Sequence, residues 1–236
     1  MLPLIALVVM ASTPVEAFNL GNQHYAQKDY AGAALAYQEA LQAGPNAAVH
    51  FNLGNALFKS GRIGQAIVHY RRAHYLAPRD PEIVSNLGFA RAYRVDKLLS
   101  AQSPLARAID ETLHRLSRRE ASLLAAVFFT LTGACVAGWI VSRRPGLIVA
   151  AALCGATSAY GLLSQQAWAS EVGGRPAVVV VPEVHALSGP GEDSKEILLL
   201  HDGTEVRIRE TRGDYLLVQL PGGGGWVRKD AVERVY

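Results

Sequence analysis

Apolar and small residues recur at helical spacing through much of the first half of the chain, in segments that end at glycine or proline. Residues 18–44 contain two such amphipathic segments, and residues 48–77 repeat the plan. The tripeptide Asn-Leu-Gly marks the copies at 19–21, 52–54 and 86–88. Intervals of 33 and 34 residues are typical of stacked helix-turn-helix repeats. This part of the chain is therefore predicted to be a helical repeat domain.

The positions that match between the copies are small, aromatic or proline. Aligned on their glycines, the copies pair Ala33 with Ala66, Tyr37 with Tyr70, Ala40 with Ala73 and Pro45 with Pro78. Small residues let helices approach, tyrosines fill the gap between them and prolines end the second helix. These offsets resemble the tetratricopeptide (TPR) family over roughly residues 14–100. A third copy departs from the pattern, and residues 105–118 are expected to form a helix that covers the end of the stack.

Two long apolar runs follow this repeat domain, which we place at residues 18–119. Residues 122–141 and 147–168 contain no charged side chain, and each is long enough to cross a bilayer as a helix. A five-residue link, 142–146, joins them. We expect a transmembrane hairpin over residues 120–169, which places the soluble parts before and after it on one side of the membrane.

The pattern changes to alternating, β-branched segments from residue 176 to residue 236. Val206 and Ile208 alternate with charged residues and are expected to face a core. The order of Ser-Gly-Pro-Gly at 188–191, Gly-Asp-Tyr at 213–215 and Gly-Trp-Val at 225–227 resembles the bacterial SH3-like (SH3b) family. The predicted fold is thus multidomain α + β: an α-helical TPR solenoid, a two-helix transmembrane hairpin and a small all-β SH3-like barrel.

The N-terminal segment favours export. Residues 1–17 contain an apolar run and end in Val-Glu-Ala, a pattern typical of a signal peptide. Arg143 and Arg144 in the link favour a cytoplasmic turn, whereas Arg115, Arg118 and Arg119 before the first run favour the reverse. The signal-like segment decides between them. The expected location is the bacterial inner membrane, with the soluble domains outside the cytoplasm.

Composition and charge argue against an enzyme and against a nucleic-acid-binding protein. The net charge is only +3, and no basic stripe with interleaved aromatic residues is present. The two cysteines, Cys135 and Cys154, lie inside the apolar runs, so the soluble parts contain no cysteine nucleophile. The seven histidines are scattered and are expected on helix surfaces rather than in a metal site. We therefore expect no enzyme, no cofactor and no metal.

Asparagines are the candidate binding residues of the repeats. An amide offers a donor and an acceptor, so a row of amides can hold the backbone of an extended peptide. The alternative is that asparagine is simply common at these offsets in TPR sequences. The predicted groove consists of Asn19, Asn22, Asn52, Asn55, Asn86 and Arg91. On the barrel, Tyr215 and Trp226 are candidate surface residues, although core packing is the stronger interpretation for Trp226.

The order of the parts resembles the BatE-like TPR proteins of the bacterial aerotolerance (Bat) group. That resemblance implies a membrane-anchored scaffold in envelope or oxidative stress tolerance, with von Willebrand A-type membrane proteins and a MoxR-type ATPase system as partners. Membrane lipid and peptidoglycan are further partners that the parts suggest. A sensor or transport-complex subunit that signals through the hairpin is the alternative function, and a cell-wall-binding accessory of a hydrolase is a third.

Overall fold

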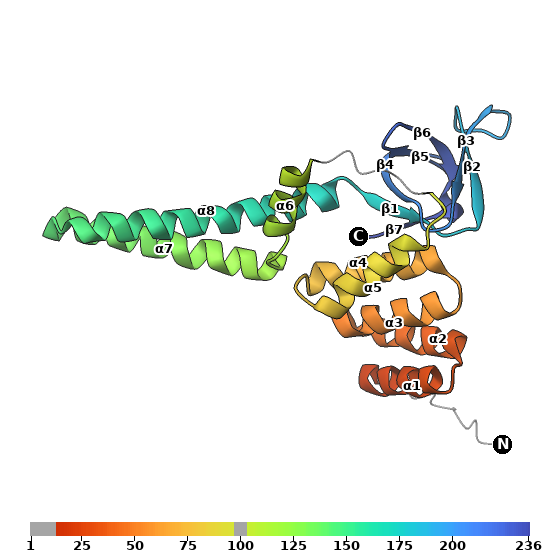
Figure 1. Cartoon of the computed structure of the whole chain (residues 1–236), viewed down its shortest axis with the longest axis horizontal. Helices are drawn as coiled ribbons and strands as arrows, with labels where there is room; N and C mark the ends of the chain where they lie inside the picture. Colours follow the sequence, from red (N-terminus) through yellow and green to blue (C-terminus); the bar gives the residue numbers. More distant parts are fainter. Residues whose placement is uncertain (1–12, 97–102) are drawn as a thin grey trace, which may run out of the picture.

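The computed structural model describes residues 13–96 and 103–236, in which eight α-helices precede a seven-stranded sheet (Figure 1). The helices are α1 (Pro14–Ala26), α2 (Tyr30–Ala40), α3 (Ala47–Lys59), α4 (Ile63–Leu76), α5 (Pro81–Ala92), α6 (Pro104–Leu113), α7 (Arg118–Ser142) and α8 (Pro145–Gly173). The strands are β1 (Pro176–Val179), β2 (Glu183–Leu187), β3 (Glu196–His201), β4 (Glu205–Arg212), β5 (Tyr215–Leu220), β6 (Gly223–Arg228) and β7 (Val232–Arg234). Short 3-10 turns follow α2 and β6, at Leu41–Ala43 and Lys229–Ala231.

Helices α1 to α5 stack as the repeat pattern predicts. The glycine of each Asn-Leu-Gly copy on α1 and α3 lies under a tyrosine of the following helix. A Cβ atom on Gly21 would come within 2.5 Å of the Tyr37 ring, and one on Gly54 would come within 2.7 Å of the Tyr70 ring. Both tyrosines are buried. The glycines are therefore required by the close packing of paired helices.

The first helix begins earlier than the signal-like segment allows. Thr13 caps α1 in a capping box with Glu16, and Pro14 occupies its first turn. Ala17 is fully buried in the repeat core. Cleavage after Ala17 would therefore remove the cap and the first turn of α1. Residues 1–12 lie outside the described residues.

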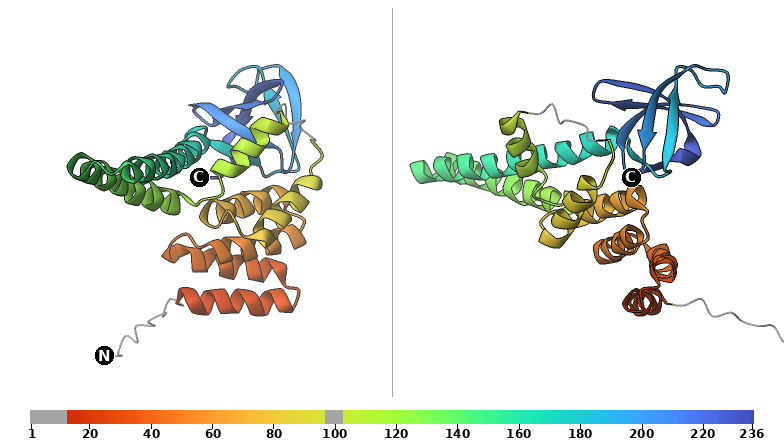
Figure 2. Two further views of the ribbon diagram at one scale, coloured as in Figure 1. Left: turned by 60° about the vertical axis from the view of Figure 1, so that its left-hand side comes forward. Right: turned by 45° about the vertical axis from the view of Figure 1, so that its right-hand side comes forward.

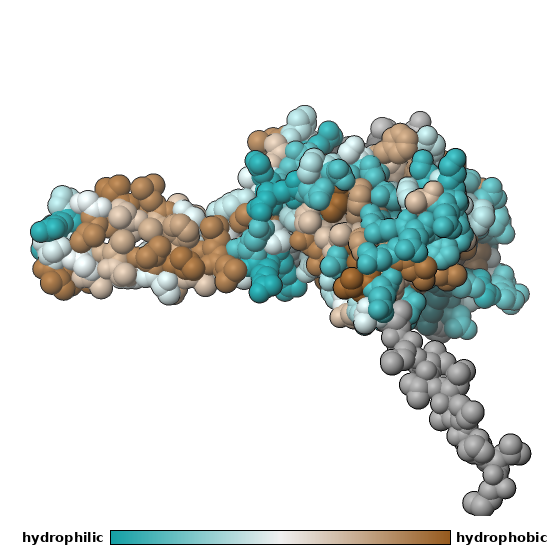
Figure 3. All heavy atoms as spheres, turned by 90° about the horizontal axis from the view of Figure 1, so that it is seen from below, coloured by the Kyte–Doolittle hydropathy of each residue, from teal (hydrophilic) through white to brown (hydrophobic). Residues whose placement is uncertain are grey.

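Helices α7 and α8 form a long antiparallel hairpin that projects from the rest of the molecule (Figure 1). Small residues bring the two helices together: the Ser158 Oγ donates to the Ala125 carbonyl at 3.0 Å, and Gly161 lies against Ala121. Both helices are long and apolar enough to cross a membrane. Their outward side chains are apolar and exposed, with Phe129 at 70% and Leu153 at 66% (Figure 3).

The helix expected to cover the repeats lies elsewhere. Helix α6 packs against α8, where the Ser164 Oγ donates to the Leu113 carbonyl at 2.6 Å. In Figure 2 it lies beside the base of the hairpin. The end of the repeat stack is contacted by the sheet instead, because β1 and β7 lie on α4. Val178 and Val235 belong to the same buried cluster as the repeat residues.

All strand pairs are antiparallel, in the order β3-β2-β6-β5-β4-β1-β7. Val206 and Ile208 are buried, as their alternation predicts. The pairing leaves β3 and β7 at opposite edges, so the structure shows an open sheet and not the expected closed barrel. Strand β2 meets β6 through a single residue pair, Leu187 with Trp226. The weak link between β2 and β6 leaves the β2–β3 hairpin at the margin of the sheet.

Polar contacts hold the β3–β4 turn against the repeats. The Asp202 carboxylate accepts from the Gly64 amide at the start of α4, at 3.0 Å. Asp96, just after α5, accepts from the His201 amide at 2.9 Å and from the Thr204 hydroxyl. Apolar burial and directed hydrogen bonds therefore act on the same interface, which gives the sheet one orientation on the repeats.

Candidate protein-binding groove

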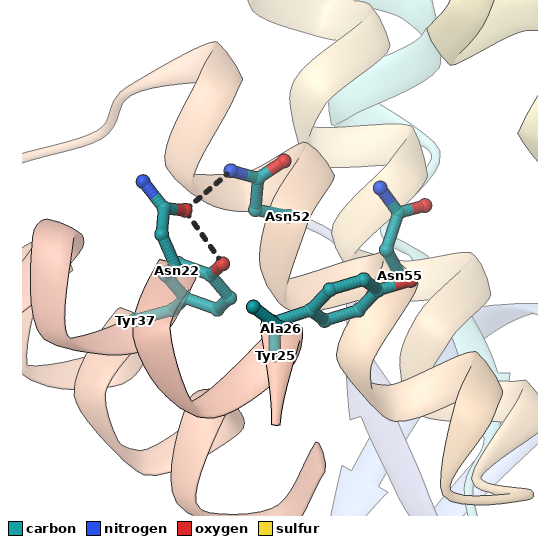
Figure 4. Close-up of a pocket in the computed structure, with 6 residues that line it drawn as sticks. All are labelled: Asn22, Tyr25, Ala26, Tyr37, Asn52 and Asn55. Carbon is teal, nitrogen blue, oxygen red and sulfur yellow. Dashed lines mark hydrogen bonds between the residues drawn. The ribbon is translucent and has the colours of Figure 1, made fainter. Parts of the chain in front are cut away.

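The asparagines of the first helices gather on one face of the repeat stack. A hollow of about 160 Å³ opens there, between α1, α2 and α3 (Figure 4). Its lining is neutral and mixes aromatic rings with side-chain amides: Asn22, Tyr25, Ala26, Tyr37, Asn52 and Asn55. The structure therefore brings three of the predicted groove residues to one concave surface.

Hydrogen bonds orient the amides of the first repeat. The Tyr37 hydroxyl donates to the Asn22 Oδ1 at 2.8 Å, and the Asn52 Nδ2 donates to the same oxygen at 3.4 Å (Figure 4). Burial raises the pKa of Tyr37, so the hydroxyl keeps its proton and acts as the donor. The acceptor atom of Asn22 is thus occupied, which leaves its Nδ2 group to face outward.

The second repeat contains the same arrangement. The Tyr70 hydroxyl donates to the Asn55 Oδ1 at 2.7 Å, and the Asn86 Nδ2 donates to that oxygen at 2.9 Å. Burial raises the pKa of Tyr70 as well. Amides with fixed orientation suit the backbone of an extended chain, which presents both donors and acceptors. The groove can therefore hold a peptide by hydrogen bonds, without a charge and without chemistry at a reactive centre.

Asn19 and the third repeat depart from this pattern. Asn19 is exposed on α1, the first helix that the structure describes, and does not line the hollow. In the third repeat Phe89 stands where Asn22 and Asn55 stand in the first two. Its ring lies 5.5 Å from that of Phe58 and 5.0 Å from that of Tyr93. The third repeat thus has an aromatic cluster at the position where the first two repeats have an amide.

Arg91, also predicted in the groove, lies in the interface with the sheet. Its Nε and NH2 groups each lie 2.8 Å from a carboxylate oxygen of Glu205 on β4. Arg94 reaches the same carboxylate at 2.9 Å, and Arg71 reaches it at 3.2 Å. A bidentate pair of this kind fixes the Arg91 guanidinium in place. Arg91 is therefore paired with the sheet and does not line the hollow.

The cluster around Glu205 also reaches the hairpin. Arg71 contacts Glu171 near the end of α8 at 2.6 Å. Burial by itself would raise the pKa of Glu205, but Arg91, Arg71 and Arg94 together lower it to about 2. The carboxylate stays ionised and joins the repeats to the sheet. The sequence does not predict this cluster, because its residues come from four elements. The extra arginines of the third repeat are the one local sign of it.

The two candidate residues of the sheet differ in exposure. Tyr215 is half-buried at the start of β5, opposite Arg228. Trp226 is buried on β6, and the Arg212 guanidinium lies 5.4 Å from its ring centre. Trp226 therefore packs within the sheet domain rather than forming an exposed surface.

Two histidines are buried, contrary to the expectation of surface positions. The Nδ1 atoms of His50 on α3 and His69 on α4 lie 3.0 Å apart. Burial, with Arg72 nearby, lowers the pKa of His50 to about 4 and that of His69 to about 3. Among residues 13–96 and 103–236, no three His, Cys, Asp or Glu side chains gather where they could hold a metal ion. The two histidines are thus neutral and form a hydrogen bond between α3 and α4.

Comparison with known proteins agrees with the repeat geometry. Residues 14–47 and 47–80 each match a family model described as a tetratricopeptide repeat. A search of curated proteins finds no match. The matched residues include all those that line the hollow. The chain thus contains two tetratricopeptide repeats, over residues 14–80, and repeats of this family indicate a role in protein–protein interaction.

Proposed function

We propose that this protein is a membrane-anchored, non-enzymatic scaffold that holds an extended segment of a partner protein in its repeat groove. The observation that carries the proposal is the repeated set of one tyrosine and two asparagines. In each set the amide oxygen of Asn22 or Asn55 is fixed by two donors. Fixed amides lose little conformational entropy when a ligand binds.

The hairpin supports the membrane part of the proposal. Its two helices have the length and composition of spans, and their apolar side chains are exposed. Burial of these side chains in lipid removes the cost of exposing them to water. Both the repeats and the sheet lie at the base of the hairpin (Figure 1), which supports a location of both parts on one side of the membrane.

The proposed location is the outer face of the bacterial inner membrane. The signal-like pattern of residues 1–17 and the arginines at the hairpin tip, Arg143 and Arg144, support this orientation, whereas the arginines at its base favour the reverse. The resemblance to the Bat group, on the order of the parts, points to envelope stress tolerance and to von Willebrand A-type and MoxR-type partners. The sheet, which resembles SH3b modules in sequence, is a second binding surface for protein or peptidoglycan. A reporter fused after Tyr236 that is active in the cytoplasm would contradict this orientation.

One observation favours a second function, that of a sensor which signals through the hairpin. The arginines of α4 and α5 connect Glu205 of the sheet with Glu171 of α8. Ligand binding that moved α5 would change these contacts. A scaffold remains the better supported function, since the link at the hairpin tip offers little surface to a cytoplasmic partner.

Site-specific photo-crosslinking tests the groove. A benzophenone amino acid replaces Ala26, which lines the hollow, in the full chain within its native membrane. We expect one or a few defined crosslinked proteins, and we expect them to be lost on Asn22→Ala with Asn55→Ala. The double variant removes the fixed amides, whereas the apolar packing of the repeats stays in place.

Asn19→Ala is the matched control, because Asn19 is an exposed asparagine of the same helix outside the hollow. It should leave the crosslinks unchanged. Crosslinks that survive the double variant, or that disappear equally with Asn19→Ala, would show that the groove is not the binding surface.

A further inference from the structure

Helix α6 is amphipathic, and its apolar face is open to solvent. Leu105 and Ile109 are one turn apart and are 71% and 51% exposed. Arg107, Asp110 and Glu111 occupy the opposite face. No residue of α6 is buried. A helix of this kind is stable only where something covers its apolar face.

The hydrogen bonds of α8 fix the place of α6. Side chains of α8 donate to three backbone carbonyls at the end of α6 and in the turn that follows. The Tyr160 hydroxyl bonds the Thr112 oxygen at 2.8 Å, the Ser164 Oγ bonds the Leu113 oxygen and the Trp168 Nε1 bonds the Leu116 oxygen at 2.8 Å. Helix α6 then runs across α8 rather than along it (Figure 1 and the right-hand view of Figure 2).

At this level α8 changes from apolar to polar. Leu162 and Leu163 are 56% and 58% exposed, and Gln165 and Gln166 follow them. An open hollow of about 420 Å³ joins these four residues to Arg118 of α7. An arginine and two amides beside two leucines match the boundary between lipid headgroups and acyl chains.

We propose that α6 lies in the membrane surface, with Leu105 and Ile109 in the boundary between headgroups and acyl chains. This inference rests on the proposed membrane anchoring by α7 and α8. Three observations carry it: the exposed apolar face, the orientation across α8 and the position at the polar boundary of α8. The occupant of the apolar face is therefore the lipid bilayer.

The charges around α6 suit an anionic lipid surface. Exposed arginines on or beside α6 outnumber the two acidic residues of the helix, Asp110 and Glu111: they are Arg107, Arg115, Arg118 and Arg119. Basic side chains near an amphipathic helix strengthen its binding to acidic headgroups. Helix α6 then supports the hairpin at the surface, and the repeats and the sheet are held just beyond it.

Spin-label depth measurements test the inference. Single cysteines at positions 105, 109, 107 and 111 are labelled with a nitroxide in the full chain, with Cys135→Ala and Cys154→Ala. The protein is reconstituted in vesicles of phosphatidylcholine and phosphatidylglycerol. Labels at 105 and 109 should collide several-fold more with oxygen, relative to a water-soluble nickel complex, than labels at 107 and 111. A label at 153 on α8 serves as the standard for a deep position.

The outcomes separate this inference from the membrane anchoring. A deep label at 153, with 105 and 109 as accessible to nickel as 107 and 111, would overturn the inference and leave the anchoring intact. A label at 153 that is accessible to nickel would overturn both. Vesicles without phosphatidylglycerol should reduce the difference between the two faces of α6, because the arginines lose their anionic partners.

Discussion

At the scale of single residues, asparagine side chains link each repeat to the one before it. Asn52 donates to Asn22, and Asn86 donates to Asn55. The recurring Asn-Leu-Gly pattern predicted these positions but left two interpretations, family background or contact residue. The structure shows that these amides contact one another between repeats, while contact with a ligand stays a prediction. Spacing alone could not reveal the contact between repeats, because the partner of each amide lies 30 or 31 residues away in another helix.

The glycines of the same tripeptide provide a prediction. Gly54→Ala should lower the free energy of unfolding of the repeats by about 2 kcal/mol, because the new methyl group would press on the buried Tyr70 ring. Chemical denaturation of the full chain in detergent micelles, read by hydrogen exchange of α3 and α4, measures this change.

Gly88→Ala is the matched control from the third copy. A Cβ atom there meets nothing within 4 Å, and Gly88 lies inside α5. The substitution should raise stability by about 0.5–1 kcal/mol, as alanine is the better helix former. Equal effects at the two glycines would contradict the packing described for Gly54.

At the scale of elements, the contact between α3 and α4 includes the buried histidine pair. In a neutral pair one ring donates and the other accepts, which satisfies both facing Nδ1 atoms. The expectation of surface histidines was wrong here. Helical periodicity gives the direction of a side chain from its own helix, but burial also depends on which helix lies opposite.

The pair predicts a loss of stability in mild acid. Its pKa values are lowered in the folded protein, so the unfolded chain takes up protons first as the pH falls below about 6.5. Stability is thus full above pH 6.5 and falls toward pH 4. Between pH 6.5 and 4.5 each histidine should cost about 2 kcal/mol of folding free energy, so the pair should cost about 4 kcal/mol. Glu205 adds little in this window, since the unfolded chain protonates this carboxylate only near and below pH 4.5, where the lowered pKa of the folded protein begins to cost stability.

Unfolding of α3 and α4, followed by hydrogen exchange at each pH, measures this dependence. His50→Gln with His69→Gln should flatten it, although the double variant is less stable at neutral pH. His185→Gln is the control, because the His185 side chain is 53% exposed on β2. A flat profile for the unaltered protein in this pH range would contradict the assignment.

At the scale of the whole molecule, Glu205 joins three parts of the chain. It pairs with arginines of α4 and α5, and Arg71 continues the contact to Glu171 of α8. Tyr236 at the end of the chain also donates to Glu171, at 3.3 Å. The repeats, the sheet and the base of the hairpin are thus held in one arrangement by a cluster that no local pattern predicts.

Replacement of this carboxylate tests the arrangement. Glu205→Gln leaves three guanidinium groups without their common partner in a buried site. The stability of the repeat–sheet interface should therefore fall by about 3 kcal/mol. Hydrogen exchange of α5 and β4 should accelerate together. Glu210→Gln on the same strand is the control, with a loss of stability below about 1 kcal/mol, since Glu210 is 44% exposed and pairs with the nearby, exposed Arg212. Similar effects of the two changes would show that the cluster does not hold the parts together.

The sequence by itself determined the elements whose signals are local and periodic. Repeat spacing predicted α1 to α4, unbroken apolar length predicted α7 and α8, and alternation placed Val206 and Ile208 in the sheet core. Tertiary structure alone decided how the parts meet. It placed α6 on α8 rather than on the repeats, left the sheet open and paired Arg91 with Glu205 of the sheet. Helix and strand periods arise from a few neighbouring residues, whereas docking depends on surfaces that exist only once distant elements have folded.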